Sequence, residues 1–183
     1  ATGFGGYISS WIIKNHLNRF LIGQDARNLT LMYDQMYRAA LPYSGQNGVV
    51  MNTIAAIDLA LWDLLGKIRN EPVYKLIGGN VKDKLQTYVT GVKPKLYKEW
   101  GHAGAKIPLA YGPGDGPAGL KKNVEIIMEA RKEVGKDFRL MVDCYMSLDV
   151  PYAIDLANAV REANLYWIEE ALPPHDLESH KYI

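Results

Sequence analysis

The segment FRLMVDCYMSLDVPYAIDLANAVREANLYWIEE, residues 138–170, contains one complete strand–helix–strand unit. The apolar run at 138–143 predicts a buried strand, residues 150–165 predict a helix, and residues 166–170 predict the next strand. Two strands joined through a helix in this way lie parallel, with a right-handed crossover. The segment therefore predicts an α/β fold in which helices pack on a parallel sheet.

The same alternation of strands and helices extends back to residue 84. We expect strands at 85–92 and 102–109, and helices at 93–100 and 116–135. With the two strands of the opening segment, about four parallel strands lie between residues 84 and 183. In such sheets the chemistry collects at the carboxyl ends of the strands.

The part of the chain before residue 84 has a helical pattern instead. Helices are predicted at residues 8–23, 28–41, 54–68 and 71–80. The third of these has a broad apolar stripe that must face other helices or a sheet, formed by Ile54, Ile57, Leu61, Leu64, Leu65 and Ile68. Because Asp58, Asp63 and Lys67 interrupt it, the run is predicted to be too short and too charged to span a bilayer.

The overall composition excludes several classes of protein. The chain has 183 residues, 48% of them hydrophobic, with 21 Lys and Arg against 20 Asp and Glu. No basic block is interleaved with aromatic residues, so we expect neither a nucleic acid nor a membrane as a partner, but a small molecule. The single cysteine, Cys144, excludes an intrachain disulfide and a cysteine-rich zinc site, and favours a cytoplasmic protein.

Two acidic residues stand where predicted strands end. Asp143 closes the strand at 138–143, and Glu169 closes the strand at 166–170. Successive parallel strands deliver both carboxylates to one edge of the sheet, where oxygen ligands suit Mg²⁺. Strand alternation would direct Tyr145 to the same side as Asp143, and Glu170 either to the opposite side from Glu169 or into the loop that follows. The alternative is that both acids cap the helices that follow them.

The chain also carries two patterns that resemble a known family. The stretch AAIDLALWDLLGKIRNEPVYKLIGG, residues 55–79, resembles the first signature of the mandelate racemase and muconate lactonizing enzymes of the enolase superfamily, although Asn52 replaces the usual alanine. The second signature of that family places metal-binding acids at the ends of the third and fourth barrel strands. These positions fall on Asp143 and Glu169, whereas Tyr145 and Ala171 depart from the usual asparagine and proline.

This resemblance implies both a fold and an activity. The fold would be the helical part of an enolase-type capping domain at 1–83, followed at 84–183 by about the first four strands of a (β/α)8 barrel. The stretches VDCYMSLDVPYA and WIEEALPP are most similar to the acid-sugar dehydratase branch. The implied activity is that of a carbon–oxygen lyase, which removes the proton alpha to the carboxylate of a sugar acid such as L-rhamnonate and expels the beta-hydroxyl. The implied cofactor is Mg²⁺, bound by Asp143 and Glu169, and a homo-oligomer is expected.

The remaining candidate residues support this activity less directly. Lys106 and Tyr145 are candidate substrate-binding residues, although Lys106 could instead be solvated or face a helix, and Tyr145 could fill the barrel interior. Many relatives have Lys-x-Lys where this chain has Lys106 and Pro108, which disfavours a two-base racemase. The four histidines share no metal-ligand spacing. Residues 112–119 lack the ending of a phosphate-binding loop and are expected to form a flexible loop at the rim.

The length of the predicted barrel limits what the chain can contain. A complete (β/α)8 barrel takes about 250 residues, and the chain has neither an initiator methionine nor the later strands. We therefore expect a piece of a longer enzyme, with the general base and the third metal ligand beyond Ile183 and no catalytic residue assigned within the chain. The alternatives are a noncatalytic truncated relative, or another acid-sugar dehydratase or a cycloisomerase of the same family.

Overall fold

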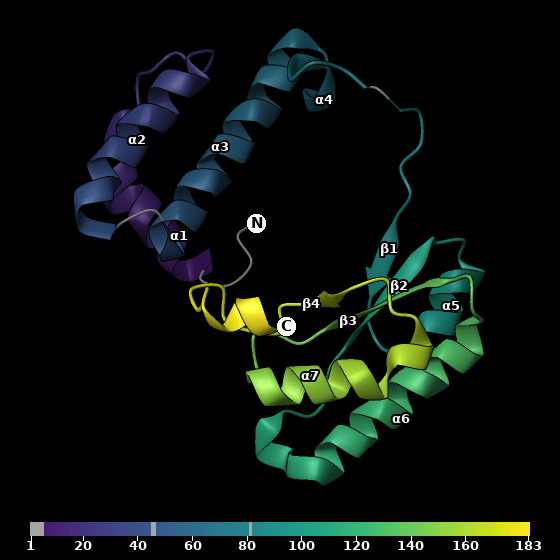
Figure 1. Cartoon of the computed structure of the whole chain (residues 1–183). Helices are drawn as coiled ribbons and strands as arrows, with labels where there is room; N and C mark the ends of the chain where they lie inside the picture. Colours follow the sequence, from purple (N-terminus) through teal and green to yellow (C-terminus); the bar gives the residue numbers. More distant parts are fainter. Residues whose placement is uncertain (1–5, 45–46, 81) are drawn as a thin grey trace. The chain divides into compact units, whose positions relative to one another are not determined.

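The computed structural model describes residues 6–44, 47–80 and 82–183. The chain divides into two compact units, residues 1–83 and 84–183 (Figure 1). The first unit is helical, and the second contains the sheet. Each unit is described separately below.

The described residues of the helical unit form four α-helices and two short irregular turns. Its elements are α1 (Gly6–Ile12), a π-helical turn (Ile13–Leu17), a 3₁₀ turn (Asn18–Phe20), α2 (Leu29–Ser44), α3 (Gly48–Arg69) and α4 (Val73–Leu76). The helix predicted at 8–23 is thus present, but its hydrogen-bonding pattern changes after Ile12. The helix predicted at 54–68 begins six residues earlier, at Gly48.

Helix α3 packs against α1 and α2 through one apolar cluster. Ile54 and Ile57 are buried there beside Ile12 and Met36. The predicted stripe is only partly buried, because Leu64 and Ile68 at its far end are 42% and 56% exposed, and Leu61 is half-buried.

The observed length of α3 overturns one prediction from the sequence. At 22 residues, α3 is long and apolar enough, by length and composition alone, to cross a membrane. The prediction that this run is too short to do so was therefore wrong, because it counted only the helix from 54 to 68. The core helix of a soluble protein meets the same criterion when it is mostly buried, whereas 22% of the apolar stretch of α3 is buried in the structure.

The second unit contains one parallel sheet with the strand order β1-β2-β3-β4. The strands are β1 (Tyr88–Thr90), β2 (Gly104–Pro108), β3 (Arg139–Asp143) and β4 (Ile168–Glu169). The helices are α5 (Pro94–Glu99), α6 (Gly116–Val134) and α7 (Val150–Ala159), with 3₁₀ turns at Pro113–Asp115, Arg161–Ala163 and Ser179–Tyr182. The predicted four-stranded α/β fold is confirmed, although β1 and β4 are shorter than expected.

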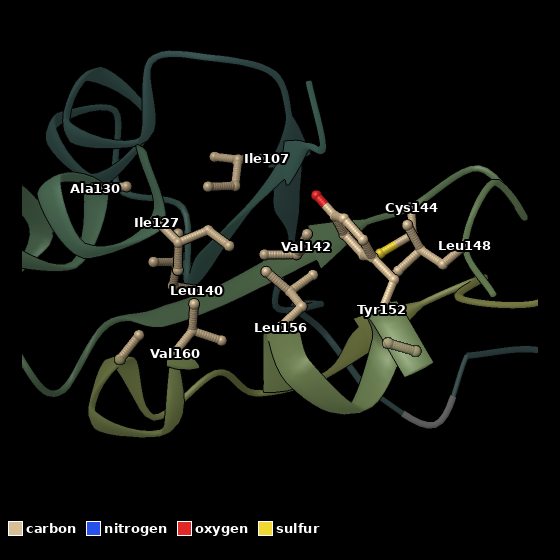
Figure 2. Packing of buried hydrophobic residues seen from close by; sticks show 12 residues of the cluster. Ile107, Ile127, Ala130, Leu140, Val142, Cys144, Leu148, Tyr152, Leu156 and Val160 are labelled. Carbon is tan, nitrogen blue, oxygen red and sulfur yellow. The ribbon is translucent and has the colours of Figure 1, made fainter. Parts of the chain in front are cut away.

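Helices α6 and α7 cover one face of this sheet (Figure 1). Leu140 and Val142 of β3 point into the helical layer, where they pack with Ile127 of α6 and Leu156 of α7 (Figure 2). Side chains alternate along a strand, so Met141 and Asp143 lie on the opposite face. We call this opposite face the concave face.

The start of β3 is held in place by a buried arginine. Arg131, near the end of α6, donates hydrogen bonds to four main-chain carbonyl groups, those of Gly135, Phe138, Ala163 and Asn164, at 2.6–3.2 Å. These carbonyls belong to the loop before β3 and to the connection between α7 and β4. One side chain therefore ties together the segments that lead into both strands carrying the predicted metal ligands.

Aromatic contacts show that the sheet is curved. Tyr88 of β1 and Trp167, which immediately precedes β4, have ring centroids 5.5 Å apart at an interplanar angle of 82°. Neighbouring strands lie about 4.8 Å apart, so a flat sheet would separate β1 from β4 by roughly 14 Å. The outer strands must therefore curl toward each other on the concave face, as in part of a barrel.

Candidate metal centre

The predicted acids lie side by side at one edge of the sheet. Asp143 ends β3, Glu169 ends β4, and the two residues are direct partners in the parallel register. Asp143 is buried, whereas the side chain of Glu169 is 31% exposed. The register brings both carboxylates to the carboxyl edge of the sheet, as the sequence predicts for successive parallel strands.

A lysine from the neighbouring strand lies between these two carboxylates. Lys106 of β2 is buried, and its Nζ is 2.8 Å from Asp143 Oδ2 and 2.6 Å from Glu169 Oε1. Lys106 is therefore neither solvated nor turned toward a helix, two alternatives that its sequence context left open. Its possible role in binding substrate stays a prediction.

The cluster of Lys106, Asp143 and Glu169 contains more acidic groups than basic ones. Burial alone would lower the pKa of Lys106, but hydrogen bonds and charge interactions with Asp143 and Glu169 outweigh it and raise the pKa above its usual value. Lys106 is thus firmly cationic. One ammonium group and two carboxylates leave a net charge of minus one in a largely buried site, which favours binding of a further cation.

Each of the four carboxylate oxygens receives one hydrogen bond or ion pair. Besides the two oxygens that face Lys106, Asp143 Oδ1 accepts from the backbone N–H of Tyr145 at 3.2 Å. Glu169 Oε2 accepts from the indole N–H of Trp167 at 3.0 Å. Trp167 was not among the residues predicted from the sequence, although its position two residues before Glu169 predicts the same side of the strand.

The backbone just beyond the two acids is not extended. Tyr145, Met146 and Glu170 have φ angles of 52°, 59° and 49°, in the left-handed region that bulky residues rarely adopt. The alternation that directed Tyr145 to the side of Asp143 therefore ends with β3, and the side on which Tyr145 lies stays a prediction. Tyr145 is 56% exposed at the rim, and its contact with substrate stays a prediction.

Neither acid caps the helix that follows it in the chain. The N-cap of α7 is Asp149, whose side chain accepts a hydrogen bond from the backbone N–H of Tyr152 at 2.9 Å. Asp143 lies on the concave face with Lys106 instead. Asp149, and not Asp143, is therefore the residue that caps α7. The carboxylates of Asp143 and Glu169 both contact the ammonium group of Lys106 instead.

The loop that follows β2 is more ordered than predicted. Residues 112–119 were expected to form a flexible loop, but they form a 3₁₀ turn and the first residues of α6. The buried Asn123 holds this loop by hydrogen bonds to both main-chain groups of Tyr111, and it also donates to the hydroxyl of Tyr152. The loop between β2 and α6 is therefore held in one conformation by the hydrogen bonds of Asn123.

The donor chemistry fits a hard divalent cation, but the donor set is not complete. Carboxylate oxygens are the ligands that Mg²⁺ prefers, usually one or two with water and substrate oxygens. Within residues 6–44, 47–80 and 82–183, no three His, Cys, Asp or Glu side chains are grouped so that they could hold a metal ion. Asp143 and Glu169 could thus supply two ligands, and the described residues place no third His, Cys, Asp or Glu side chain with them.

Family models match both units of the chain. A model described as the mandelate racemase/muconate lactonizing enzyme N-terminal domain matches residues 5–78. A second model, described as enolase C-terminal domain-like, matches residues 85–183. The two matches together cover nearly the whole chain.

Solved structures resemble the chain over almost its full length. The crystal structure of L-rhamnonate dehydratase from Gibberella zeae is 51% identical, with a TM-score of 0.93, over 99% of this chain and 46% of that one. The same organism's rhamnonate dehydratase complexed with Mg is 50% identical, with a TM-score of 0.90, over 94% and 42%. The 3,6-anhydro-D-galactonate cycloisomerase from Zobellia galactanivorans is 31% identical, with a TM-score of 0.82, over 93% and 50%. The chain thus spans half or less of the length of these proteins.

Proposed function

Because the chain belongs to the mandelate racemase/muconate lactonizing enzyme family, we propose that it forms part of a Mg²⁺-dependent acid-sugar dehydratase. The proposed reaction removes the proton alpha to the carboxylate of a sugar acid and expels the beta-hydroxyl as water. The proposed substrate is L-rhamnonate or a close analogue, supported by 51% identity to an L-rhamnonate dehydratase. This proposed activity belongs to the whole protein. The chain would contribute two of its metal ligands.

The observation that carries this proposal is the convergence of two carboxylates on one cationic centre. Asp143 Oδ2 and Glu169 Oε1 both lie within 2.8 Å of Lys106 Nζ, at the carboxyl edge of the sheet. We propose that these two oxygens bind Mg²⁺. When bound, the ion would stabilise the negative charge that develops on the substrate carboxylate as the alpha proton leaves.

The other residues of the site would bind and orient the substrate. Lys106 places a second positive charge beside the carboxylates, so it can also attract the carboxylate of a sugar acid. Tyr145 lies exposed at the rim and offers a hydroxyl and a ring to the sugar chain. The general base and the third metal ligand are proposed to lie beyond Ile183, since the matched dehydratase is more than twice as long.

Three broader features belong to the same proposal. Residues 1–83 would form the helical part of a capping domain, and residues 84–183 the first half of a (β/α)8 barrel. A cytoplasmic location is supported by a single cysteine that is fully buried. A homo-oligomer is also part of the proposal; if the protein were instead the truncated noncatalytic relative, the open edges of its unfinished parallel sheet would pair with a second copy.

The proposal is tested by incubating the full-length protein with L-rhamnonate and Mg²⁺. Loss of water gives an enol that becomes a 2-oxo-3-deoxy acid, so we expect a new carbonyl product that disappears when a chelator removes the metal. A product that retains the mass of the substrate would indicate a cycloisomerase or a racemase instead. No reaction at full metal occupancy, with L-rhamnonate and related sugar acids, would favour the noncatalytic relative.

A substitution then tests the metal ligands themselves. Asp143→Asn keeps the size of the side chain but removes its charge, so we expect Mg²⁺-dependent turnover to be lost. The matched control is Asp155→Asn, which changes an exposed acid on α7 and should leave turnover unchanged. Normal activity of the Asp143→Asn protein would contradict the assignment of this ligand.

A further inference from the structure

We infer that Trp167 is a positioning residue for the metal centre, because its indole N–H determines which oxygen of Glu169 is offered to the cation. This inference rests on the proposed function, since it concerns one of the two proposed ligands. It adds a residue of the chain that is neither a metal ligand nor a substrate contact.

The hydrogen bonds of Glu169 divide its two oxygens between different partners. Oε2 accepts from Trp167 Nε1 at 3.0 Å, and Oε1 lies 2.6 Å from Lys106 Nζ. A partly exposed glutamate has several rotamers to choose from, and a hydrogen bond to its charged form holds it more strongly than a neutral pair would. With Oε2 bonded to Trp167 and Oε1 to Lys106, the carboxylate plane is fixed and Oε1 remains directed toward the cationic centre.

The indole that provides this anchor is itself held by two aromatic neighbours. The ring of Tyr88 meets it edge to face, with centroids 5.5 Å apart, and the ring of Tyr166 lies 5.2 Å away at an angle of 49°. Edge-to-face contacts favour particular ring orientations. Since the indole nitrogen can only donate, the acceptor Glu169 Oε2 is the partner that its fixed direction selects.

The two proposed metal ligands differ in how they are anchored. Asp143 Oδ1 accepts from the main chain of Tyr145, so no substitution other than proline can remove its donor. Glu169 Oε2 depends on the side chain of Trp167. Trp167 is therefore the position where the orientation of a ligand can be altered without changing the ligand. Loss of such a supporting group typically weakens metal binding by roughly 10- to 100-fold.

The test compares Trp167→Phe with the unchanged full-length protein. Phenylalanine keeps a ring against Tyr88 and Tyr166 but lacks the N–H donor. By titration calorimetry we expect the Kd for Mg²⁺ to rise about tenfold, while the unfolding temperature of the metal-free protein stays within about 3 °C. Turnover should recover at saturating Mg²⁺. The matched control, Trp100→Phe, removes an indole from an exposed site after α5 and should leave the Kd unchanged.

Each outcome of this test has a distinct meaning. An unchanged Kd for Trp167→Phe, in a protein that binds Mg²⁺ and dehydrates its substrate, overturns the inference and leaves the proposed function standing. A higher Kd that comes with a large fall in metal-free unfolding temperature also overturns it, because the role of Trp167 is then structural. An unchanged protein that binds no Mg²⁺ overturns the proposed function itself.

A second measurement applies if Trp167→Phe does not fold. The full-length protein can be labelled with 5-fluorotryptophan, and the resonance of every tryptophan other than Trp167 can be assigned by replacing each in turn with Phe. We expect the fluorine resonance of Trp167 to shift on addition of Mg²⁺ while those of Trp11, Trp62 and Trp100 do not move. A Trp167 resonance that stays unchanged at saturating Mg²⁺ would overturn the inference.

Discussion

The two units of the chain differ in what their cores are made of. In the α/β unit, four polar or charged side chains are at least nine-tenths buried, Lys106, Asn123, Arg131 and Asp143, and each has partners distant in sequence. In the described part of the helical unit, the buried polar side chains are Ser9 and Thr53, and Thr53 bonds only to Val49 one turn away. Long-range polar contacts therefore specify the α/β unit, whereas apolar packing specifies the helical unit.

The largest effect that would sharpen this comparison is expected at Lys106. Replacing Lys106 with Met leaves two neighbouring carboxylates without their shared cation, and removing one partner of a buried ion pair costs about 4 kcal/mol. We expect this loss in the unfolding free energy of the metal-free protein, measured by urea denaturation. The same variant should bind Mg²⁺ more tightly, because no ammonium competes for Asp143 and Glu169. Unchanged stability without metal would show that the cluster does not specify the unit.

A slightly smaller effect is expected at Arg131. Arg131→Met fills a similar volume but leaves the carbonyls of Gly135, Phe138 and Ala163 without their donor, and the loss should be about 3 kcal/mol. Arg161→Met is the control, since Arg161 is exposed and bonds only to Asn158, and its effect should stay within about 0.5 kcal/mol. Equal effects of the two substitutions would break the comparison.

The next largest loss of unfolding free energy is expected at Asn123, because its side chain holds a loop and not a strand. Asn123→Ala removes the bonds to the main chain of Tyr111 and to the hydroxyl of Tyr152, with an expected loss of about 2 kcal/mol. Hydrogen exchange should increase at Tyr111 and in the adjacent 3₁₀ turn, and protection of β3 should stay unchanged. Increased exchange throughout β3 instead would mean that Asn123 supports the whole unit.

The smallest effect is expected in the helical unit. Ile54→Val removes one methylene from a fully buried side chain and should cost about 1 kcal/mol. Leu59→Ala, on the exposed side of the same helix, should change the unfolding free energy by less than about 0.5 kcal/mol. If Ile54→Val cost more than Arg131→Met, apolar packing would dominate both units and the distinction between them would fail.

Element type was predictable from sequence because it follows from local periodicity. The strand–helix alternation after residue 84 and the four helices before it are all present in the structure. The ends of elements were less predictable, since they depend on partners. β4 ends at Glu169, because Glu170 adopts a left-handed backbone conformation that leaves the extended strand.

The candidate site was predictable to the extent that backbone position determines it. Asp143 and Glu169 were identified because they end successive strands, and a parallel register then brings them together. Lys106 was harder to place, because a long flexible side chain can reach several partners and its spacing does not reveal which. Trp167 was missed because an aromatic residue before a strand is usually a core residue. The left-handed backbone at Tyr145 gave no signal, since bulky residues rarely adopt it.

Because Cys144 is buried, the rate at which its thiol is chemically modified can report how often this site opens. The thiol lies on the helical side of β3, beside the ring of Tyr152 (Figure 2). Burial, together with the charge of Asp143, raises its pKa to about 12, so the buried thiol stays in its unreactive protonated form at neutral pH. An alkylating reagent would thus modify Cys144 chiefly in molecules whose strand has left its helices. The rate of labelling then measures how often the strand that carries Asp143 detaches.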